Sequence, residues 1–268
     1  MTEPLPDNTD SLITYEIRDK AAWLTLNRPE RHNALSVPLL TTLIARLQQA
    51  AQDEQARVVV LTGAGPKAFC AGADIDSFFN ETQGTVSDHA FKEQLVKLFE
   101  LLMELGKPTI ARVNGLALGG GFGVAMACDL VVASENAAFG TPEANIGLFP
   151  MVIMTVLYRN IPRKKLLELM YTGEKVPAAE ALELGMINQV VPAAELDQAV
   201  STLAGKIAAK SGMTLKLGRE AFYTMADMPM PAALAYLKQM LSQNLHTTDA
   251  REGLQAFLEK RPPVWKDR

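Results

Sequence analysis

The sequence predicts an α/β protein: a mostly parallel β-sheet with crossover helices, followed by a helical C-terminal part. Three observations carry this prediction. Apolar runs typical of buried strands alternate with amphipathic helical segments along the first part of the chain. Beyond Pro162 the pattern changes to consecutive helices. The 268 residues, 48% of them hydrophobic, supply enough apolar material for a sizeable core.

The first part of the chain contains most of the predicted strands. Residues 1–10 are acidic and rich in proline, and we expect a disordered lead-in there. Two strands separated by Asp19-Lys20 are expected to form a hairpin. The next segment has Ser36 as N-cap, Pro38 in its first turn and apolar residues at helical spacing. The predicted strands are 12–18, 22–26, 58–61, 109–113 and 130–133, and the predicted helices are 37–52, 88–105 and 121–127.

The C-terminal part is predicted to be helical, with one short strand at 187–191. The predicted helices are 163–170, 178–184, 194–209, 215–225, 231–246 and 249–258. Strand-helix units near Val58 and Thr109 recur along the chain and are consistent with a coiled stack of ββα units. We therefore divide the chain into a lead-in at 1–10, a core at 11–192 and a helical region at 193–268.

Charge and composition argue against several classes of protein. The net charge of −4 gives no reason to expect nucleic acid or an anionic membrane as a partner. Cys70 and Cys128 form no disulfide framework and fit a reducing, cytoplasmic location. Residues 1–10 resemble neither a signal peptide nor an Arg-rich transit peptide. The most apolar window, 113–128, is too short and too rich in glycine for a membrane span.

The most informative stretch runs from Gly115 to Glu143. Glycines 119–121 place backbone amides at the start of a short apolar helix, and Glu143 follows Gly123 by twenty positions. Amides at a helix N-terminus stabilise negative oxygen, and a carboxylate in an apolar wall can take or give a proton. The pattern indicates chemistry in which a carbonyl oxygen becomes an enolate. Alternatively, the glycines only permit a tight turn and Glu143 is a structural carboxylate.

Four ordered motifs resemble the enoyl-CoA hydratase/isomerase (crotonase) family. They are LNRPERHNAL at 26–35, GAGPKAFCAGADI at 63–75, PTIARVNGLALGGG at 108–121, and ACDL through FGTPE at 127–143. The resemblance implies a crotonase-like spiral of ββα units with a helical C-terminal trimerisation region. It also implies an acyl-CoA thioester substrate, and a homotrimer or a dimer of trimers. It implies no metal and no cofactor, with coenzyme A entering only as part of the substrate.

The resemblance also assigns the candidate site residues. The backbone amides of Ala73 and Gly120 would form an oxyanion hole, because preorganised donors stabilise the charge that develops on a thioester oxygen. Glu143 would be the acid/base group. Coenzyme A would lie along the first two motifs, and contacts with it are expected at Ala71, Ala73, Asp74, Ile75, Asp76, Gly119, either Arg28 or Arg31, and either Lys260 or Arg261.

Alternatives exist for several of these binding residues. The guanidinium groups of Arg28 and Arg31 suit phosphates, but both could instead be solvated loop charges. Asp74 could cap a following helix. Lys260 or Arg261 could approach a coenzyme phosphate, that of a neighbouring subunit included, or belong to a solvated tail.

Gly123 bears on the type of reaction. Hydratases of the family carry a second glutamate at this position, whereas isomerases work with the glutamate that matches Glu143. The segment 144–157 has no ionisable residue, and Met151 stands where some relatives have an aspartate. We therefore expect isomerisation or hydration of an enoyl-CoA, with isomerisation at least as fast. The alternatives are an acyl-CoA-binding protein without turnover and a structural protein without affinity for coenzyme A.

Other catalytic arrangements find little support in the sequence. His32, His89 and His246 show no metal-ligand spacing with the two cysteines. The Gly-x-Ser-x-Gly pattern of serine hydrolases is absent. Cys70 is better explained as a small buried thiol than as a nucleophile.

Overall fold

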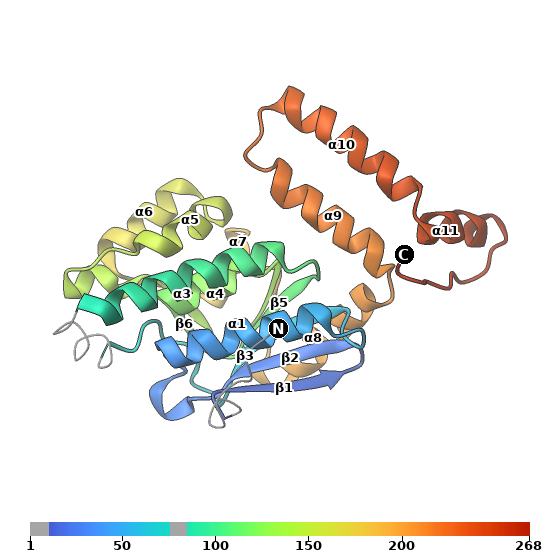
Figure 1. Cartoon of the computed structure of the whole chain (residues 1–268). Helices are drawn as coiled ribbons and strands as arrows, with labels where there is room; N and C mark the ends of the chain where they lie inside the picture. Colours follow the sequence, from blue (N-terminus) through green and yellow to red (C-terminus); the bar gives the residue numbers. More distant parts are fainter. Residues whose placement is uncertain (1–10, 76–84) are drawn as a thin grey trace.

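The computed structural model describes residues 11–75 and 85–268, and they build two β-sheets with helices around them (Figure 1). The larger sheet has six strands in the order β1-β2-β3-β5-β7-β10. β1 and β2 pair antiparallel, and the remaining neighbours are parallel. The strands are β1 Ile13–Arg18, β2 Ala21–Leu26, β3 Val58–Gly63, β5 Thr109–Val113, β7 Leu130–Ser134 and β10 Gln189–Val191. The predicted α/β class and parallel sheet are confirmed.

The smaller sheet was not predicted. It contains four strands in the order β4-β6-β8-β9, namely β4 Ala68–Cys70, β6 Leu116–Leu118, β8 Ala138–Gly140 and β9 Lys175–Pro177. Each of β4, β6 and β8 follows directly on a strand of the larger sheet, β3, β5 and β7 respectively. The chain therefore passes from one sheet to the other at each turn, which is the coiled arrangement expected of ββα units.

The interior strands are buried on both faces, as the apolar run in β3 predicts. Val59 and Leu61 join a large cluster beneath α1 (Val37–Gln52), α3 (Thr85–Glu104) and α4 (Gly120–Ala127). Val58 and Val60 point to the opposite face, where α8 (Leu196–Ala208) packs. Thus α8, although part of the predicted helical region, covers the larger sheet.

Local signals in the first elements act as predicted. Asp19 and Lys20 have φ of 45° and 66°, the left-handed conformation that a two-residue hairpin turn requires. The hydroxyl of Ser36 accepts a hydrogen bond from the amide of Leu39 at 3.5 Å and so caps α1.

The other predicted helices are present, with small differences at their ends. They are α6 Arg163–Thr172, α7 Ala178–Glu183, α9 Gly212–Met225, α10 Met230–Leu245 and α11 Thr248–Leu258. Helix α5 (Met151–Asn160) and the 3-10 turns η1 (Pro29–Arg31), η2 (Pro142–Ile146) and η3 (Ala193–Glu195) were not predicted. None of the helices in 11–75 and 85–268 is both long enough and apolar enough to cross a membrane.

Helices α9, α10 and α11 form an arm that extends away from the two sheets (Figure 1). Its root is fastened by Arg219, which is buried in α9. The guanidinium donates to Asp129 Oδ2 at 2.8 Å and to the carbonyl of Met103 at 2.7 Å, near the C-terminal end of α3. The hydroxyl of Tyr223 donates to the other oxygen of Asp129 at 2.6 Å. A half-buried carboxylate with partners on both oxygens therefore joins the arm to the core.

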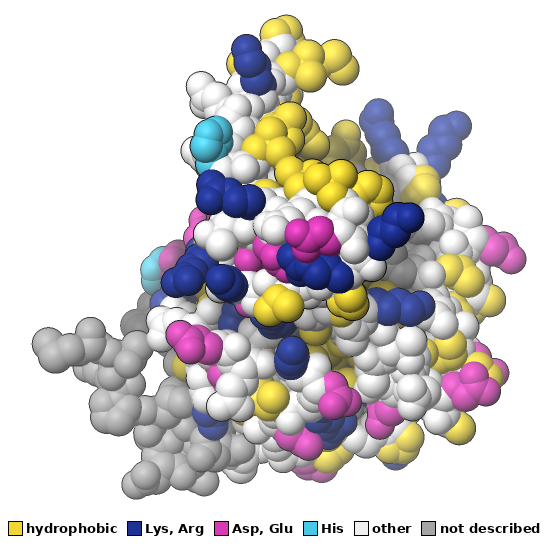
Figure 2. All heavy atoms as spheres, turned by 90° about the vertical axis from the view of Figure 1, so that its right-hand side faces the viewer, with side chains coloured by type: hydrophobic (Ala, Val, Ile, Leu, Met, Phe, Trp, Pro, Cys, Tyr) yellow, Lys and Arg dark blue, Asp and Glu magenta, His cyan; other side chains and the backbone are white. Residues whose placement is uncertain are grey.

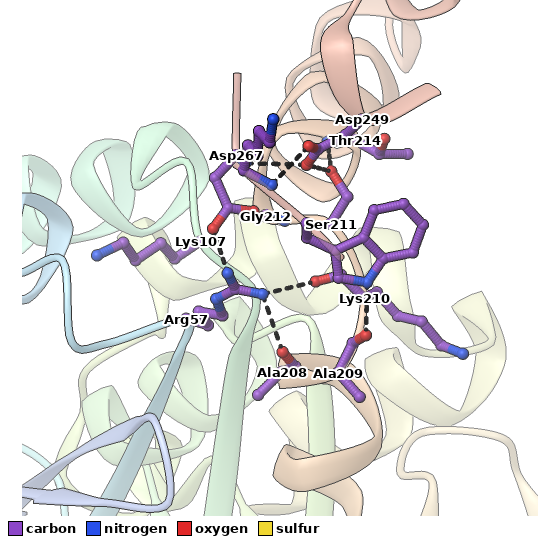
Figure 3. Close-up of polar contacts among 12 residues, drawn as sticks. Arg57, Lys107, Ala208, Ala209, Lys210, Ser211, Gly212, Thr214, Asp249 and Asp267 are labelled. Carbon is purple, nitrogen blue, oxygen red and sulfur yellow. Dashed lines mark hydrogen bonds and ion pairs between the residues drawn. The ribbon is translucent and has the colours of Figure 1, made fainter. Parts of the chain in front are cut away.

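The tail after α11 folds back between the arm and the core (Figure 3). The carboxylate of Asp249 accepts from Ser211 Oγ at 2.6 Å, from the amide of Lys266 at 2.7 Å and from the amide of Asp267 at 3.0 Å. Asp267 in turn forms an ion pair with Arg57, which lies just before β3. This ion pair links the tail directly to the core.

Candidate active site

Two backbone segments, one from the second motif and one from the third, meet at the first turn of α4. Gly119, the N-cap, has φ of 49°, a value that favours glycine. Gly72 lies against this turn, since a Cβ added to it would be 3.6 Å from the amide nitrogen of Gly120. A Cβ added to Gly121 would lie 2.2 Å from the carbonyl oxygen of Cys70. The glycines therefore permit the turn, as the alternative interpretation holds, and also let the two segments touch.

The amide of Ala73 is turned toward this junction by a β-bridge. Leu35 and Ala73 form an isolated parallel bridge, in which the amide of Leu35 donates to Gly72 O at 2.7 Å and the amide of Asp74 donates to Leu35 O at 2.8 Å. In such a bridge the central residue's own N–H points away from its partner. Among the described residues, no acceptor pairs with the amide of Ala73 or of Gly120. Two unpaired amides on touching segments are suited to bind a negative oxygen.

Glu143 lies on the other side of the α4 N-terminus. It stands in η2 directly after β8, and the amide of Gly119 donates to Gly140 O at 2.9 Å, which holds the two segments together. A Cβ on Gly119 would lie 2.9 Å from Glu143 Oε1, so the carboxyl group packs against this glycine. Oε2 is buried and has no hydrogen-bond partner in the described part of the chain. Burial raises the pKa of Glu143, as expected for an acid/base group.

The position of Gly123 is enclosed by apolar side chains. Gly123 lies one helical turn beyond Gly119 and Gly120 and therefore on the same face of α4. A Cβ added here would be 2.5 Å from Cγ2 of Ile153 in α5 and 3.0 Å from Cζ of Phe99 in α3. Both side chains are buried. The sequence places Ile153 in the pocket wall or the core but does not connect it with Gly123, and it does not single out Phe99.

Arg28 of the first motif and Asp74 of the second form an ion pair. Arg28 Nη2 lies 2.8 Å from Asp74 Oδ2, and the two side chains are only 18% and 8% exposed. Arg28 Nη1 also donates to the carbonyl of Ala34 at 3.0 Å. Of the two arginines expected near the phosphates, Arg28 is thus paired and largely buried, whereas Arg31 is exposed.

A small hollow of about 140 Å³ lies between the first two motifs. It is lined by Pro29, His32, Asn33, Ala64, Gly65, Pro66, Lys67 and Ala68. This is the region along which the resemblance places coenzyme A. A larger hollow of about 460 Å³ lies between β10 and α8 and is lined by none of the predicted site residues.

The remaining predicted residues are scattered. Ala71 is half-buried beside the junction, and Ile75 is 51% exposed. Asp76 lies outside the described residues. Lys260 is exposed at the end of α11, which stands well apart from α4 in Figure 1. Arg261 is paired with Glu252 at 2.6 Å, so within one chain neither basic residue reaches the junction.

The alternatives to this site find no support in the described residues. In 11–75 and 85–268, no cluster of three or more His, Cys, Asp or Glu side chains could hold a metal ion. Cys70 is fully buried, and burial raises the pKa of its thiol to about 12. A thiol in that state is a poor nucleophile at neutral pH.

Comparison with known proteins gives matches over nearly the whole chain. A family model described as enoyl-CoA hydratase/isomerase matches residues 16–268. The probable mitochondrial enoyl-CoA hydratase of Dictyostelium discoideum is 35% identical, over 95% of this chain and 91% of its own length. The short-chain-enoyl-CoA hydratase of Clostridium acetobutylicum is 35% identical, over 93% and 95%. The crystal structure of human enoyl coenzyme A hydratase domain-containing protein 3 superposes with a TM-score of 0.91 at 33% identity, covering 95% of this chain and 100% of that one.

Proposed function

The chain belongs to the enoyl-CoA hydratase/isomerase family and has its crotonase-like fold, and from this premise we propose that it catalyses enolate chemistry on an acyl-CoA thioester. One observation carries the proposal. Two unpaired amides, those of Ala73 and Gly120, lie on segments that touch at the N-terminus of α4, and the carboxyl group of Glu143 packs against the same turn. A thioester carbonyl placed there would have hydrogen-bond donors and a proton acceptor within one small region.

The proposed reaction moves one proton. Glu143 takes a proton from the α-carbon, and the electron pair of that C–H bond passes toward the carbonyl to form an enolate. The amides of Ala73 and Gly120 hold the enolate oxygen, a contribution of several kcal/mol in a site that excludes water. Glu143 then returns the proton at the γ-carbon, so that the double bond shifts and no atom is gained or lost. Burial raises the pKa of Glu143, which suits a group that must both accept and return a proton.

We propose that isomerisation is at least as fast as hydration. Hydration needs a water molecule held and activated beside the double bond, a task most easily shared by two carboxylates. On the α4 face that carries Gly119 and Gly120, the next turn presents Gly123, which is covered by Ile153 and Phe99. This wall is apolar, so it offers no second acid and no partner for the water.

The decisive experiment presents the protein with matched 3-enoyl-CoA and 2-enoyl-CoA substrates of the same chain length. Chromatography coupled to mass spectrometry separates the isomers and detects added water. Isomerisation at least as fast as hydration is the expected result. Fast hydration with far slower isomerisation would contradict the one-carboxylate mechanism. Tight binding with no product would instead support an acyl-CoA-binding protein without turnover, and the absence of binding would support a structural role.

We further propose that the chain assembles as a homotrimer or a dimer of trimers. The arm displays large apolar side chains, and Figure 2 shows hydrophobic groups gathered over this part of the surface. They are Phe222, Met230, Leu234, Leu241, Leu245, Leu254, Phe257 and Leu258, each at least 55% exposed. So much exposed apolar surface is typical of an interface. Sedimentation at micromolar concentration should give three or six subunits, whereas a monomer would contradict the assembly and any contact of Lys260 with a neighbour's coenzyme.

The remaining proposals concern partners and location. We propose that no metal and no cofactor beyond the substrate's coenzyme A is needed, which dialysis against a chelator would test by leaving activity unchanged. Nucleic acid and membranes are not expected as partners. A cytoplasmic location stays a prediction. The Dictyostelium relative is named as mitochondrial, and fractionation of cells would decide for this chain.

A further inference from the structure

We propose that Arg28 is a positioning residue for the oxyanion hole, acting through Asp74 on the backbone amide of Ala73. The resemblance offered either Arg28 or Arg31 for the phosphates of coenzyme A, and the contacts of Arg28 indicate a different role. This inference rests on the proposed function, because it takes the Ala73 amide as a donor to the thioester oxygen.

The Arg28 side chain bridges the first and second motifs. One guanidinium nitrogen binds Asp74 Oδ2 at 2.8 Å, and the other donates to the carbonyl of Ala34 at 3.0 Å. The planar fork of arginine serves both acceptors at once, which a lysine ammonium could not do in the same geometry. With 18% of the Arg28 side chain and 8% of the Asp74 side chain exposed, the pair is well shielded from water.

Asp74 is bound to the first motif at two points, and Ala73 lies next to it. The Asp74 side chain binds Arg28, and the Asp74 amide donates to Leu35 O at 2.8 Å. The N–H of Ala73 belongs to the peptide unit whose carbonyl, Gly72 O, accepts from Leu35 N at 2.7 Å. Because a peptide unit is planar, fixing this carbonyl and the following residue fixes the direction of the Ala73 N–H.

The loop that carries Arg28 is itself rigidly attached. The buried side chain of Asn33 donates to Ala64 O at 3.0 Å and to Ala68 O at 2.9 Å, and its Oδ1 accepts from the Arg28 amide at 3.0 Å. Asn33 has φ of 57°, which asparagine tolerates better than most residues. Arg28 therefore starts from a fixed backbone position, as a positioning residue must.

A phosphate has little access to Arg28. Its two terminal nitrogens already bind Asp74 and the carbonyl of Ala34, and only 18% of the side chain is exposed. Arg31 lies on the same loop and is exposed, so it is the better candidate for the phosphates. The two arginines are therefore a matched pair for experiment, one positioning and one binding.

The test compares two thioesters of the same acyl group, one on coenzyme A and one on pantetheine, which lacks the nucleotide phosphates. For Arg28→Gln we expect kcat to fall about 10- to 100-fold with both thioesters, because a displaced catalytic group typically lowers the rate by such factors, and the KM of each to change little. Asp74→Asn should give the same fall, and the double variant should fall no further, since both act through one contact. Arg28→Lys should recover only part of the loss. The control Arg31→Gln should raise KM for the coenzyme A thioester alone.

The outcomes separate this inference from the proposed function. An Arg28→Gln variant whose only change is a higher KM for the coenzyme A thioester would show a phosphate contact and overturn the positioning role. A lower melting temperature with unchanged kcat, measured where the variant is folded, would show a purely structural ion pair and overturn it as well. A wild-type protein inactive on both thioesters would instead refute the proposed function.

Discussion

The amide side and the carboxyl side of the candidate site are held in different ways. On the amide side the proposed donors are backbone groups of Ala73 and Gly120, which lie at a β-bridge and a helix start, beside the Arg28–Asp74 pair. On the carboxyl side Glu143 stands in a 3-10 turn with an unpaired Oε2, as far as the described residues show. In the proposed mechanism, charge stabilisation thus depends on backbone geometry, whereas the choice of reaction depends on side chains that a substitution can exchange.

The largest effect is expected on the carboxyl side, from Glu143→Gln. The amide keeps the shape of the side chain but cannot take a proton, so turnover should fall by about 100- to 10,000-fold. The affinity for a saturated acyl-CoA, measured by calorimetry, should stay close to that of the wild type. Substantial turnover by a folded Glu143→Gln variant would show that another group moves the proton.

A smaller loss is expected on the amide side, from Gly120→Pro. Proline is tolerated at the first position of a helix but lacks the N–H, so turnover should fall on the order of 100-fold. Gly120→Ala is the control, since it keeps the N–H. Its added Cβ would meet only the end of the flexible Leu35 side chain, at 2.9 Å. A folded Gly120→Pro oligomer with full activity would refute the oxyanion assignment.

The apolar side chains around Gly123 give a third way to test the difference between the amide side and the carboxyl side. Gly123→Glu alone should destabilise the protein by about 1–3 kcal/mol through overpacking, because Ile153 and Phe99 already occupy the space. Combining it with Ile153→Ala makes room for the new side chain and should raise the ratio of hydration to isomerisation by up to about 100-fold. Gly123→Gln with Ile153→Ala adds the same bulk without the carboxyl group and should leave the ratio unchanged. An equal rise with glutamine would show that space, not the acid, limits hydration.

The smallest effect concerns pH. Glu143 must be deprotonated to act as the base, so kcat should rise as the pH passes through the pKa of Glu143. Because burial raises this pKa, the rise in kcat should occur at a pH above the ordinary value of 4.5.

The raised pKa of Glu143 also affects stability, because it favours the protonated carboxyl group in the folded state. Its contribution to stability is therefore present at low pH and is lost as pH rises through the raised pKa. Comparing melting temperatures of wild type and Glu143→Gln across pH isolates this contribution; parallel curves would show that the pKa is not raised.

The structural elements that were predicted correctly are those determined by short-range patterns in the sequence. The Asp19-Lys20 turn, the Ser36 cap and the β3 strand follow from local residues, and all three occur. The smaller sheet was missed because strands such as β4 span only three residues and show no periodicity. The partner of Arg28 was missed because it lies 46 positions away, and guanidinium chemistry suits a carboxylate as well as a phosphate.

The contact between Ile153 and Gly123 was missed for a related reason. Helix α5 lies in a segment rich in apolar residues, and nothing local to that segment indicates which of them faces Gly123. Glu143 and the glycine turn could be proposed from the sequence because they lie in one continuous stretch of the chain. The contact between α4 and α5 could not be predicted, because it depends on how two helices pack.

The Arg57–Asp267 ion pair, finally, has a consequence for the timing of folding. The two residues are 210 positions apart. At a translation rate of about 5–20 residues per second, roughly 10 to 40 seconds separate the synthesis of one from that of the other. The sheets around Arg57 can form during this interval, but the contact that ties the tail to them cannot. A nascent chain on the ribosome would therefore carry a formed core and an arm not yet fastened by its tail. In the proposed trimer, subunits would then meet with this arm fully fastened only after residue 267 had emerged.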